Sequence, residues 1–165
     1  MRVVLALGSN LGDRFATLQG AVDALFAGPD LTFVAVSPVY ETDPVGGPEQ
    51  GAYLNAVVIA DSGLEPRSLL DRAQGVENAF GRVRVERWGA RTLDVDLITV
   101  GDVVTDDPDL TLPHPRAHER AFVLVPWVRA DPGAVLSGRR VADLLAGLDQ
   151  AYVRPRTDLV LSRPV

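Results

Sequence analysis

The sequence contains no cysteine and no lysine, and only two of its 165 residues are histidines. Without cysteine the chain cannot form disulfides, thiolate nucleophiles or zinc–thiolate sites. Without lysine it can form neither a Schiff base nor the lysine-dependent phosphate loop of P-loop proteins. A metal site built from several histidines is excluded as well. Any chemistry must therefore use carboxylates, arginines, other polar side chains, aromatic rings, the backbone and bound ions.

Long apolar runs are also absent. The N-terminal run in MRVVLALGSN is too short for the hydrophobic part of a signal peptide and lacks a small-residue cleavage site. The most apolar later stretch, AFVLVPWV, is interrupted by Pro126 and is far shorter than the ~20 residues that cross a membrane. We therefore expect a cytoplasmic protein that binds no membrane. With 47% hydrophobic residues, we expect residues 1–165 to form a single domain with a substantial core.

Positive charge is scarce overall but concentrated in one segment. The net charge of −6 argues against binding to nucleic acid. Residues 82–91 hold four arginines and one glutamate, a local charge of +3 that leaves −9 for the rest of the chain. Because arginine binds phosphate oxygens with two-point geometry, this pattern favours a small polyanion as ligand. The alternative is a solubilising loop in which Arg91 pairs with Asp94. The arginines are Arg82, Arg84, Arg87 and Arg91, with Arg116 and Arg120 as candidates to join them.

The hydrophobic pattern predicts the element order β-α-β-β-α-β. Helices are expected after Asp13, a candidate N-cap, and from Pro66 to Phe80. Pro38 indicates an edge strand or a bulge. This order is typical of a ferredoxin-like sandwich, an α+β fold with a mainly antiparallel sheet, helices on one face and the other face free for a ligand. Strands are expected over residues 2–7, 31–42, 52–61 and 92–100.

Loops and C-terminal additions complete the predicted organisation. Residues 43–51 and 82–91 are expected to be loops. The segment LGSNLGDR (7–14) lies between a strand and a helix like a phosphate-binding loop, but it matches neither G-x-G-x-x-G nor a Walker A motif. We interpret it as a turn and helix cap. After Gly101 we expect a short strand, a loop over residues 110–118, helices around 118–130 and near 141–148, and an irregular tail.

Two aspartates lie two residues apart in the last core strand. Leu93, Val95 and Leu97 alternate with Asp94 and Asp96. Both carboxylates are therefore expected on one face, with Cα atoms about 6.5–7 Å apart. Mg²⁺ prefers oxygen ligands and commonly uses one or two carboxylates together with substrate phosphates. The pair is a candidate site for a metal–nucleotide complex; the alternative is a solvated face with arginine neighbours.

A second candidate site combines an amide with aromatic rings. Tyr53 and Asn55 share one face of their predicted strand, and Phe122 follows His114 by eight residues. An amide in an apolar strand needs partners, and it can both donate to and accept from a flat heterocycle. Each ring taken alone is interpreted as core packing, and Asn55 is the residue that favours a ligand site instead. His114 is not spaced from the other histidine as a metal ligand would be, and it is a candidate for a phosphate contact.

Several segments together resemble the 6-hydroxymethyl-7,8-dihydropterin pyrophosphokinase family of folate biosynthesis. They are LGSN, ETDPVGGPEQGAYLNAVV, GRVR, RWGARTLDVDLI and LTLPHPRAHERAFVLVPW, in the family's order and spacing up to about residue 130. The core pattern R-W-G-x-R-x-x-D-x-D-[LI]-I is highly specific. The resemblance implies a ferredoxin-like fold. It also implies transfer of pyrophosphate from ATP to the hydroxymethyl group of a reduced pterin, which gives AMP and the pterin diphosphate and requires Mg²⁺.

The resemblance also implies roles for individual residues. It assigns two Mg²⁺ ions to Asp94 and Asp96, and catalytic roles to Arg82 and Arg91 in a mobile loop. The implied pterin-binding residues are Thr42, Pro44, Val45, Tyr53, Asn55, Trp88 and Phe122. The implied nucleotide-binding residues are Gln74, Glu77, Arg84, Arg91, Leu97, Thr111, His114 and Arg120.

The sequence departs from the family pattern at several positions. Asp43 stands where many members have proline, and Asp109 where some carry a nucleotide-binding arginine. Val45 replaces a common leucine, and Pro115 a frequent tyrosine. These departures bear on ATP affinity and loop closure rather than on pterin recognition. Two alternatives remain open, another Mg-dependent phosphate enzyme and a non-catalytic nucleotide-binding module. The expected partners are the two small substrates alone, and the expected state is a monomer.

Overall fold

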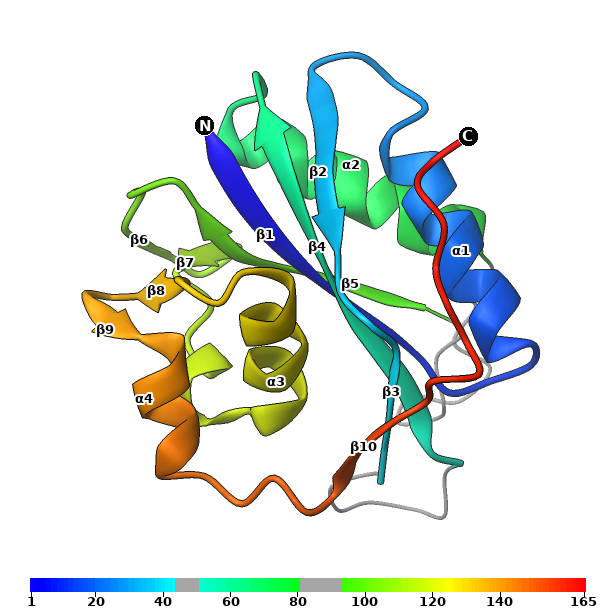
Figure 1. The fold of residues 1–165 in the computed structure, drawn as a ribbon. Helices are drawn as coiled ribbons and strands as arrows, with labels where there is room; N and C mark the ends of the chain where they lie inside the picture. The colour runs from blue at the N-terminus through cyan, green and yellow to red at the C-terminus, as the bar shows by residue number, and fades with distance from the viewer. Residues whose placement is uncertain (44–50, 81–92) are drawn as a thin grey trace.

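A mixed α/β sandwich is built around one antiparallel sheet in the computed structural model, which describes residues 1–43, 51–80 and 93–165 (Figure 1). The strand order is β10-β3-β4-β1-β5, with β2 also paired to β4. Every pairing in this sheet is antiparallel within the described ranges. The strands are β1 (Arg2–Ser9), β2 (Leu31–Val36), β3 (Tyr40–Thr42), β4 (Tyr53–Ser62), β5 (Asp94–Val100) and β10 (Val153–Pro155).

The predicted β-α-β-β-α-β core is confirmed, and its architecture is ferredoxin-like. Helix α1 (Arg14–Leu25) follows β1, and helix α2 (Pro66–Ala79) lies between β4 and β5. Asp13 caps α1 as expected, because its carboxylate accepts a hydrogen bond of 3.0 Å from the Ala16 N–H. The segment predicted as one strand over 31–42 is split into β2 and β3 around Pro38, which cannot donate a sheet hydrogen bond.

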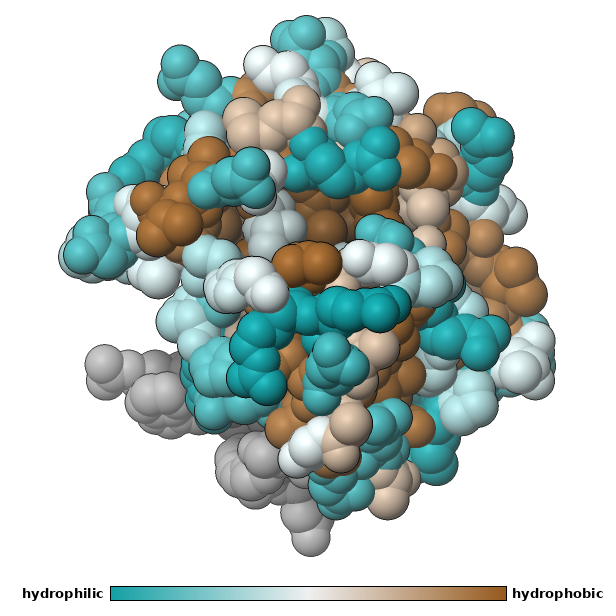
Figure 2. Space-filling view, turned by 60° about the vertical axis from the view of Figure 1, so that its left-hand side comes forward, coloured by the Kyte–Doolittle hydropathy of each residue, from teal (hydrophilic) through white to brown (hydrophobic). Residues whose placement is uncertain are grey.

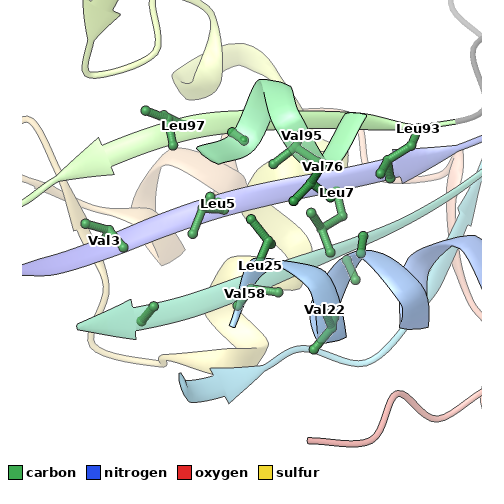
Figure 3. Packing of buried hydrophobic residues seen from close by; sticks show 14 of the residues in the cluster. Val3, Leu5, Leu7, Val22, Leu25, Val58, Val76, Leu93, Val95 and Leu97 are labelled. Atoms are coloured by element: carbon green, nitrogen blue, oxygen red, sulfur yellow. The ribbon is translucent and has the colours of Figure 1, made fainter. Parts of the chain in front are cut away.

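Helices α1 and α2 cover the first face of the sheet. Apolar side chains from alternate positions of β1, β4 and β5 pack against both helices (Figure 3). On β5 these are Val95 and Leu97, with Leu93 directly before the strand, so the predicted alternation is correct and the aspartates between them face the other way. Glu77 of α2 reaches the edge of this strand, where its buried carboxylate accepts a 2.9 Å hydrogen bond from the Val95 N–H.

The second face was expected to be free for a ligand, and this prediction is wrong for one end of the face. Helices α3 (Ala121–Ala130) and α4 (Val141–Ala146) belong to a second apolar cluster on this face. They pack where the sheet presents Val4, Val57 and Ile98. Towards the other end of the same strands the residues become small or polar, with Ala6 and Gly8 on β1 and the two aspartates on β5. The helices cover only the apolar end because burying the polar end would leave carboxylates and amides without water.

The C-terminal additions contain more strand than the sequence indicated. Strand β7 (Leu110–Leu112) pairs with β6 (Thr105–Asp107) and occupies the beginning of the expected loop over 110–118. A 3₁₀ turn (Ala117–Glu119) precedes α3, so the predicted helix starts later than expected. Strands β8 (Val135–Leu136) and β9 (Arg139–Arg140) form a small hairpin before α4.

The tail is not irregular throughout, as the sequence predicted. It supplies β10, which pairs with β3 at the sheet edge, and its last residues run alongside α1 (Figure 1). There Leu159 and Leu161 join the first apolar cluster, and the Ser162 N–H donates to the Gln19 side chain at 2.8 Å. Among the described residues, no helix combines the length and the apolar character that a membrane span requires.

Candidate active site

The uncovered end of the second face forms a pocket of about 490 Å³. Its floor comes from β1, β4 and β5, and its walls come from the end of β3, from α3 with the turn before it, and from the C-terminal segment. The described lining residues are Ala6, Leu7, Gly8, Thr42, Asp43, Tyr53, Asn55, Asp94, Asp96, Arg116, Glu119, Arg120, Phe122 and Tyr152.

Asp94 and Asp96 lie together on the pocket floor, as the alternation predicted. They pair across the sheet with Gly8 and Ala6, whose small size leaves space above β1. Both carboxylates are half-buried, where a cation would be shielded little by solvent. In the described part of the chain, no cluster of three or more acidic or histidine ligands surrounds them. A hard cation held by two carboxylates commonly takes further oxygens from water or from a ligand such as phosphate.

Asn55 has its amide held in one orientation. The Thr42 hydroxyl donates to the Asn55 Oδ1 at 2.6 Å, and the two residues are only 3% and 7% exposed. This contact leaves the Nδ2 group beside Gly8, where an added Cβ would lie 3.0 Å from it. The Nδ2 group is therefore the donor that Asn55 offers to a molecule in the pocket.

Aromatic and cationic groups form the walls. Tyr53 precedes Asn55 by two residues on β4, so both side chains lie on the same face of the strand, as predicted. Phe122 and Arg120 enter from the start of α3, and the guanidinium carbon lies 5.5 Å from the centroid of the Phe122 ring. Arg116 also lines the pocket, but its charge is paired with Glu119 at 2.8 Å. The structure thus brings an amide, two rings and a guanidinium together with the aspartates.

His114 lies next to this pocket, at a smaller cavity of about 290 Å³. Burial is the main reason that its pKa lies below the usual value; the nearby Asp96 opposes this effect, whereas Arg120 and Arg116 reinforce it. Its Nδ1 accepts a hydrogen bond of 3.2 Å from the Arg116 N–H. In the neutral ring the proton is therefore on Nε2, which is available as a donor.

The sequence matches a known protein family over most of its length. Residues 4–132 match the model of the 7,8-dihydro-6-hydroxymethylpterin-pyrophosphokinase family. The chain belongs to this family. Similar curated proteins are the 2-amino-4-hydroxy-6-hydroxymethyldihydropteridine pyrophosphokinases of Mycobacterium tuberculosis, Mycobacterium leprae and Pseudomonas aeruginosa, which are 50%, 54% and 44% identical. The matches cover 99%, 90% and 88% of this chain and 96%, 83% and 90% of those proteins.

Solved structures support the same fold. The wild-type HPPK-DHPS of Plasmodium falciparum, crystallised with pteroate, matches with a TM-score of 0.68 at 12% identity. The match covers 88% of this chain but only 42% of that protein. The family match and the curated relatives show that the protein is an ATP-dependent transferase of folate biosynthesis. It moves the pyrophosphoryl group of ATP to hydroxymethyldihydropterin, as enzymes of this pyrophosphokinase family do. The family is generally Mg-dependent.

The pyrophosphokinase resemblance assigned further residues that do not line the pocket. Gln74 is exposed on α2, and Glu77 is buried beneath β5. Leu97 belongs to the core of the first face, because it continues the alternation of Leu93 and Val95 towards α1 and α2. The Thr111 hydroxyl donates to the backbone oxygen of Asp107 at 3.1 Å. Their nucleotide contacts remain predictions.

Part of the predicted site lies outside the described residues. This applies to both residues with implied catalytic roles. It also applies to three implied pterin-binding residues and to the remaining arginines of the basic segment. These positions are Pro44, Val45, Arg82, Arg84, Arg87, Trp88 and Arg91.

Six lining residues were not assigned to the site from the sequence, namely Ala6, Leu7, Gly8, Asp43, Glu119 and Tyr152. Gly8 lies in the LGSN motif, and the need for space beside an asparagine could have indicated it. Asp43 was noted only as a departure from the family pattern, and in the structure it pairs with Arg154. Tyr152 lies in the C-terminal segment, where no motif pointed to it.

Proposed function

We propose that the pocket described above binds both substrates and that residues 1–165 act as one pyrophosphokinase domain. The observation that carries this proposal is the position of the aspartate pair. Asp94 and Asp96 share a floor with the fixed amide of Asn55, and aromatic rings stand at the walls. A reduced pterin is a flat heterocycle with donors and acceptors along its edge, so it suits this combination of rings and amide.

The pterin would lie against Tyr53 and Phe122, with its edge towards Asn55. Aromatic side chains stack well on flat rings, and the Nδ2 group can donate to a ring nitrogen or carbonyl oxygen. Because Thr42 already occupies the Asn55 Oδ1, the amide does not need to reorient when the substrate enters. Pro44, Val45 and Trp88 stay in the proposed pterin site on the basis of the resemblance.

Asp94 and Asp96 are the proposed metal ligands. Oxygen donors and half-burial fit Mg²⁺, and two dications would relieve the repulsion between two carboxylates on one strand face. When bound, Mg²⁺ neutralises phosphate charge and polarises the phosphoryl oxygens. With only two carboxylates from the described part of the chain, the triphosphate itself would complete the coordination.

In the proposed reaction, the hydroxymethyl oxygen of the pterin attacks the β-phosphorus of ATP. The bond between that phosphorus and the α–β bridging oxygen breaks, AMP leaves, and the hydroxyl proton passes to water. Transfers of this kind depend on positioning and charge stabilisation. Arg120 contributes positive charge at the pocket wall. Arg82 and Arg91, assigned by resemblance, would serve the same purpose, and His114 would donate from Nε2 to a phosphate.

Product analysis tests this proposal. Incubation of the protein with hydroxymethyldihydropterin, ATP and Mg²⁺ should give AMP and the pterin diphosphate in equal amounts. Asp94→Asn or Asp96→Asn should lower turnover at least ~100-fold, the scale of a lost electrostatic contact in the transition state. Asp106→Asn, on the exposed β6–β7 hairpin, is the matched control and should retain full activity. ADP as product, AMP release without pterin, or active aspartate variants would contradict the proposal.

The expectations of a monomer and of a cytoplasmic location also belong to this proposal. The surface supports the first expectation. On the face shown in Figure 2, hydrophobic residues lie between hydrophilic ones. The exposed large apolar side chains of the described chain include Val34, Val104, Val135 and Val160, which come from separate parts of the sequence. Sedimentation at micromolar concentration should give the mass of one chain.

A further inference from the structure

The C-terminal segment contributes an aromatic side chain to the pocket. Tyr152 lines the same pocket as Tyr53 and Phe122. It lies 20 residues beyond the end of the family match at residue 132. Its ring is partly buried against the second apolar cluster, to which α3 also belongs. The protein therefore has a pocket wall that the residues carrying the family resemblance do not provide.

Backbone pairing fixes where this wall stands. In the antiparallel β10–β3 ladder Val153 is paired with Thr42. Tyr152, directly before Val153, therefore lies opposite Asp43, directly after Thr42. The Asp43 backbone N–H accordingly donates to the backbone carbonyl oxygen of Tyr152 at 3.4 Å. Thr42 is the residue that holds Asn55. Only β3 thus separates the segment of Tyr152 from β4, which carries the amide that we propose to contact the pterin.

A two-point ion pair reinforces this pairing. The Arg154 guanidinium donates to both carboxylate oxygens of Asp43, at 3.0 and 3.1 Å. These hydrogen bonds are the main reason that the pKa of Asp43 lies below its usual value. Two-point geometry restricts both position and orientation, which a single contact does not. The aspartate that departs from the family pattern is therefore paired with a residue of β10.

We propose that Tyr152 is a further pterin-binding residue and that the Asp43–Arg154 pair positions it. This inference rests on the proposed function, because it takes the pocket to be the pterin site. Tyr152 acts by direct contact, adding a third aromatic group beside Tyr53 and Phe122. Asp43 and Arg154 act through Tyr152, by holding the C-terminal segment against the end of β3.

Steady-state kinetics of full-length variants test the proposal. Tyr152→Ala should raise the KM for hydroxymethyldihydropterin about tenfold, the scale of one lost aromatic stack, while the KM for ATP stays within about twofold. Tyr152→Phe keeps the ring and should behave like the wild type. Arg154→Gln should raise the pterin KM about threefold, since an exposed pair holds the segment only weakly.

Arg140→Gln, at an exposed position of the β8–β9 hairpin, is the control variant. Arg140 pairs with Val135 in that hairpin and takes no part in the pairing between β10 and β3. Its removal should leave the pterin KM unchanged. Thermal unfolding of every variant separates a lost contact from a lost fold. If Tyr152→Ala does not fold, Tyr152→Leu, which keeps an apolar side chain but no ring, takes its place with the same expected rise.

The outcomes separate this inference from the proposed function. If the wild type forms AMP only with pterin and a folded Tyr152→Ala or Tyr152→Leu protein keeps the wild-type pterin KM, the inference is overturned while the proposed function stands. An equal rise of both KM values overturns it as well, because Tyr152 would then support the fold of the whole pocket. If the wild type gives no pterin-dependent AMP, the proposed function itself fails.

Discussion

Replacement of Thr42 by valine should weaken both the fold and the pterin site, because one buried hydrogen bond serves both. Valine has almost the shape of threonine, so the change removes the hydroxyl without leaving a cavity. The Asn55 Oδ1 then loses the donor that lies 2.6 Å away, in a place where the residue is only 7% exposed. An unsatisfied buried acceptor costs about 1–3 kcal/mol. For a chain of this size, that lowers the melting temperature by roughly 2–10 °C.

The effect on the substrate follows from the same bond. Without the hydroxyl the Asn55 amide has no fixed orientation, so binding must supply the alignment that the wild type already has. A neutral hydrogen bond contributes about 1 kcal/mol, which corresponds to about a fivefold rise in the pterin KM. The KM for ATP should not change, because Thr42 has no proposed contact with the nucleotide.

The assay is AMP formation at varied pterin and saturating ATP, combined with thermal unfolding. Thr42→Ser is the matched control, since it keeps the hydroxyl and loses only a methyl group. The serine protein should retain a pterin KM close to that of the wild type. A valine protein with an unchanged melting temperature and an unchanged pterin KM would refute the role that we assign to this bond.

Two further predictions concern Gly8 and Glu41. Gly8→Ala should raise the pterin KM several-fold with an intact fold, because the new Cβ would lie 3.0 Å from the Asn55 Nδ2; Gly75→Ala, on open helix surface, is the control that should leave the KM unchanged. Burial raises the pKa of the Glu41 carboxyl, but hydrogen bonding and the charges of Arg14, Arg156 and Arg154 outweigh it and hold the pKa below its ordinary value of 4.5. A lowered folded-state pKa stabilises the protein above pH 4.5 and ceases to do so as the carboxylate becomes protonated. Glu41→Gln should therefore be less stable than the wild type at pH 7 in urea unfolding, and the gap should narrow below pH 4.5; a constant gap would contradict this.

Local patterns sufficed for the core of the sheet and for the aspartate pair. The alternation around Asp94 and Asp96 predicts their common face because side-chain direction in a strand depends only on odd and even positions. The same rule placed Tyr53 and Asn55 together. Asp13 was found because a helix cap is a local signal.

Contacts between distant segments could not be predicted in this way. β10 is three residues long and includes a proline, so nothing in its own sequence distinguishes it from a loop. Its strand character comes from pairing with β3, more than 100 residues earlier. The sequence also did not predict that α3 covers part of the second face, for a similar reason. A helical pattern shows which residues of the helix are apolar, but it does not show which sheet face they meet.

The position of β10 near the end of the chain has a consequence for synthesis. The strands that carry the aspartates and Asn55 are complete once the ribosome has made residue 100, whereas the partner of β3 ends at residue 155. Domains generally form as their segments emerge during translation, and pairings between distant segments come late. A nascent chain can therefore hold the aspartate pair well before it can close the wall around Tyr152. A segment translated well after the aspartate strand thus completes the pocket.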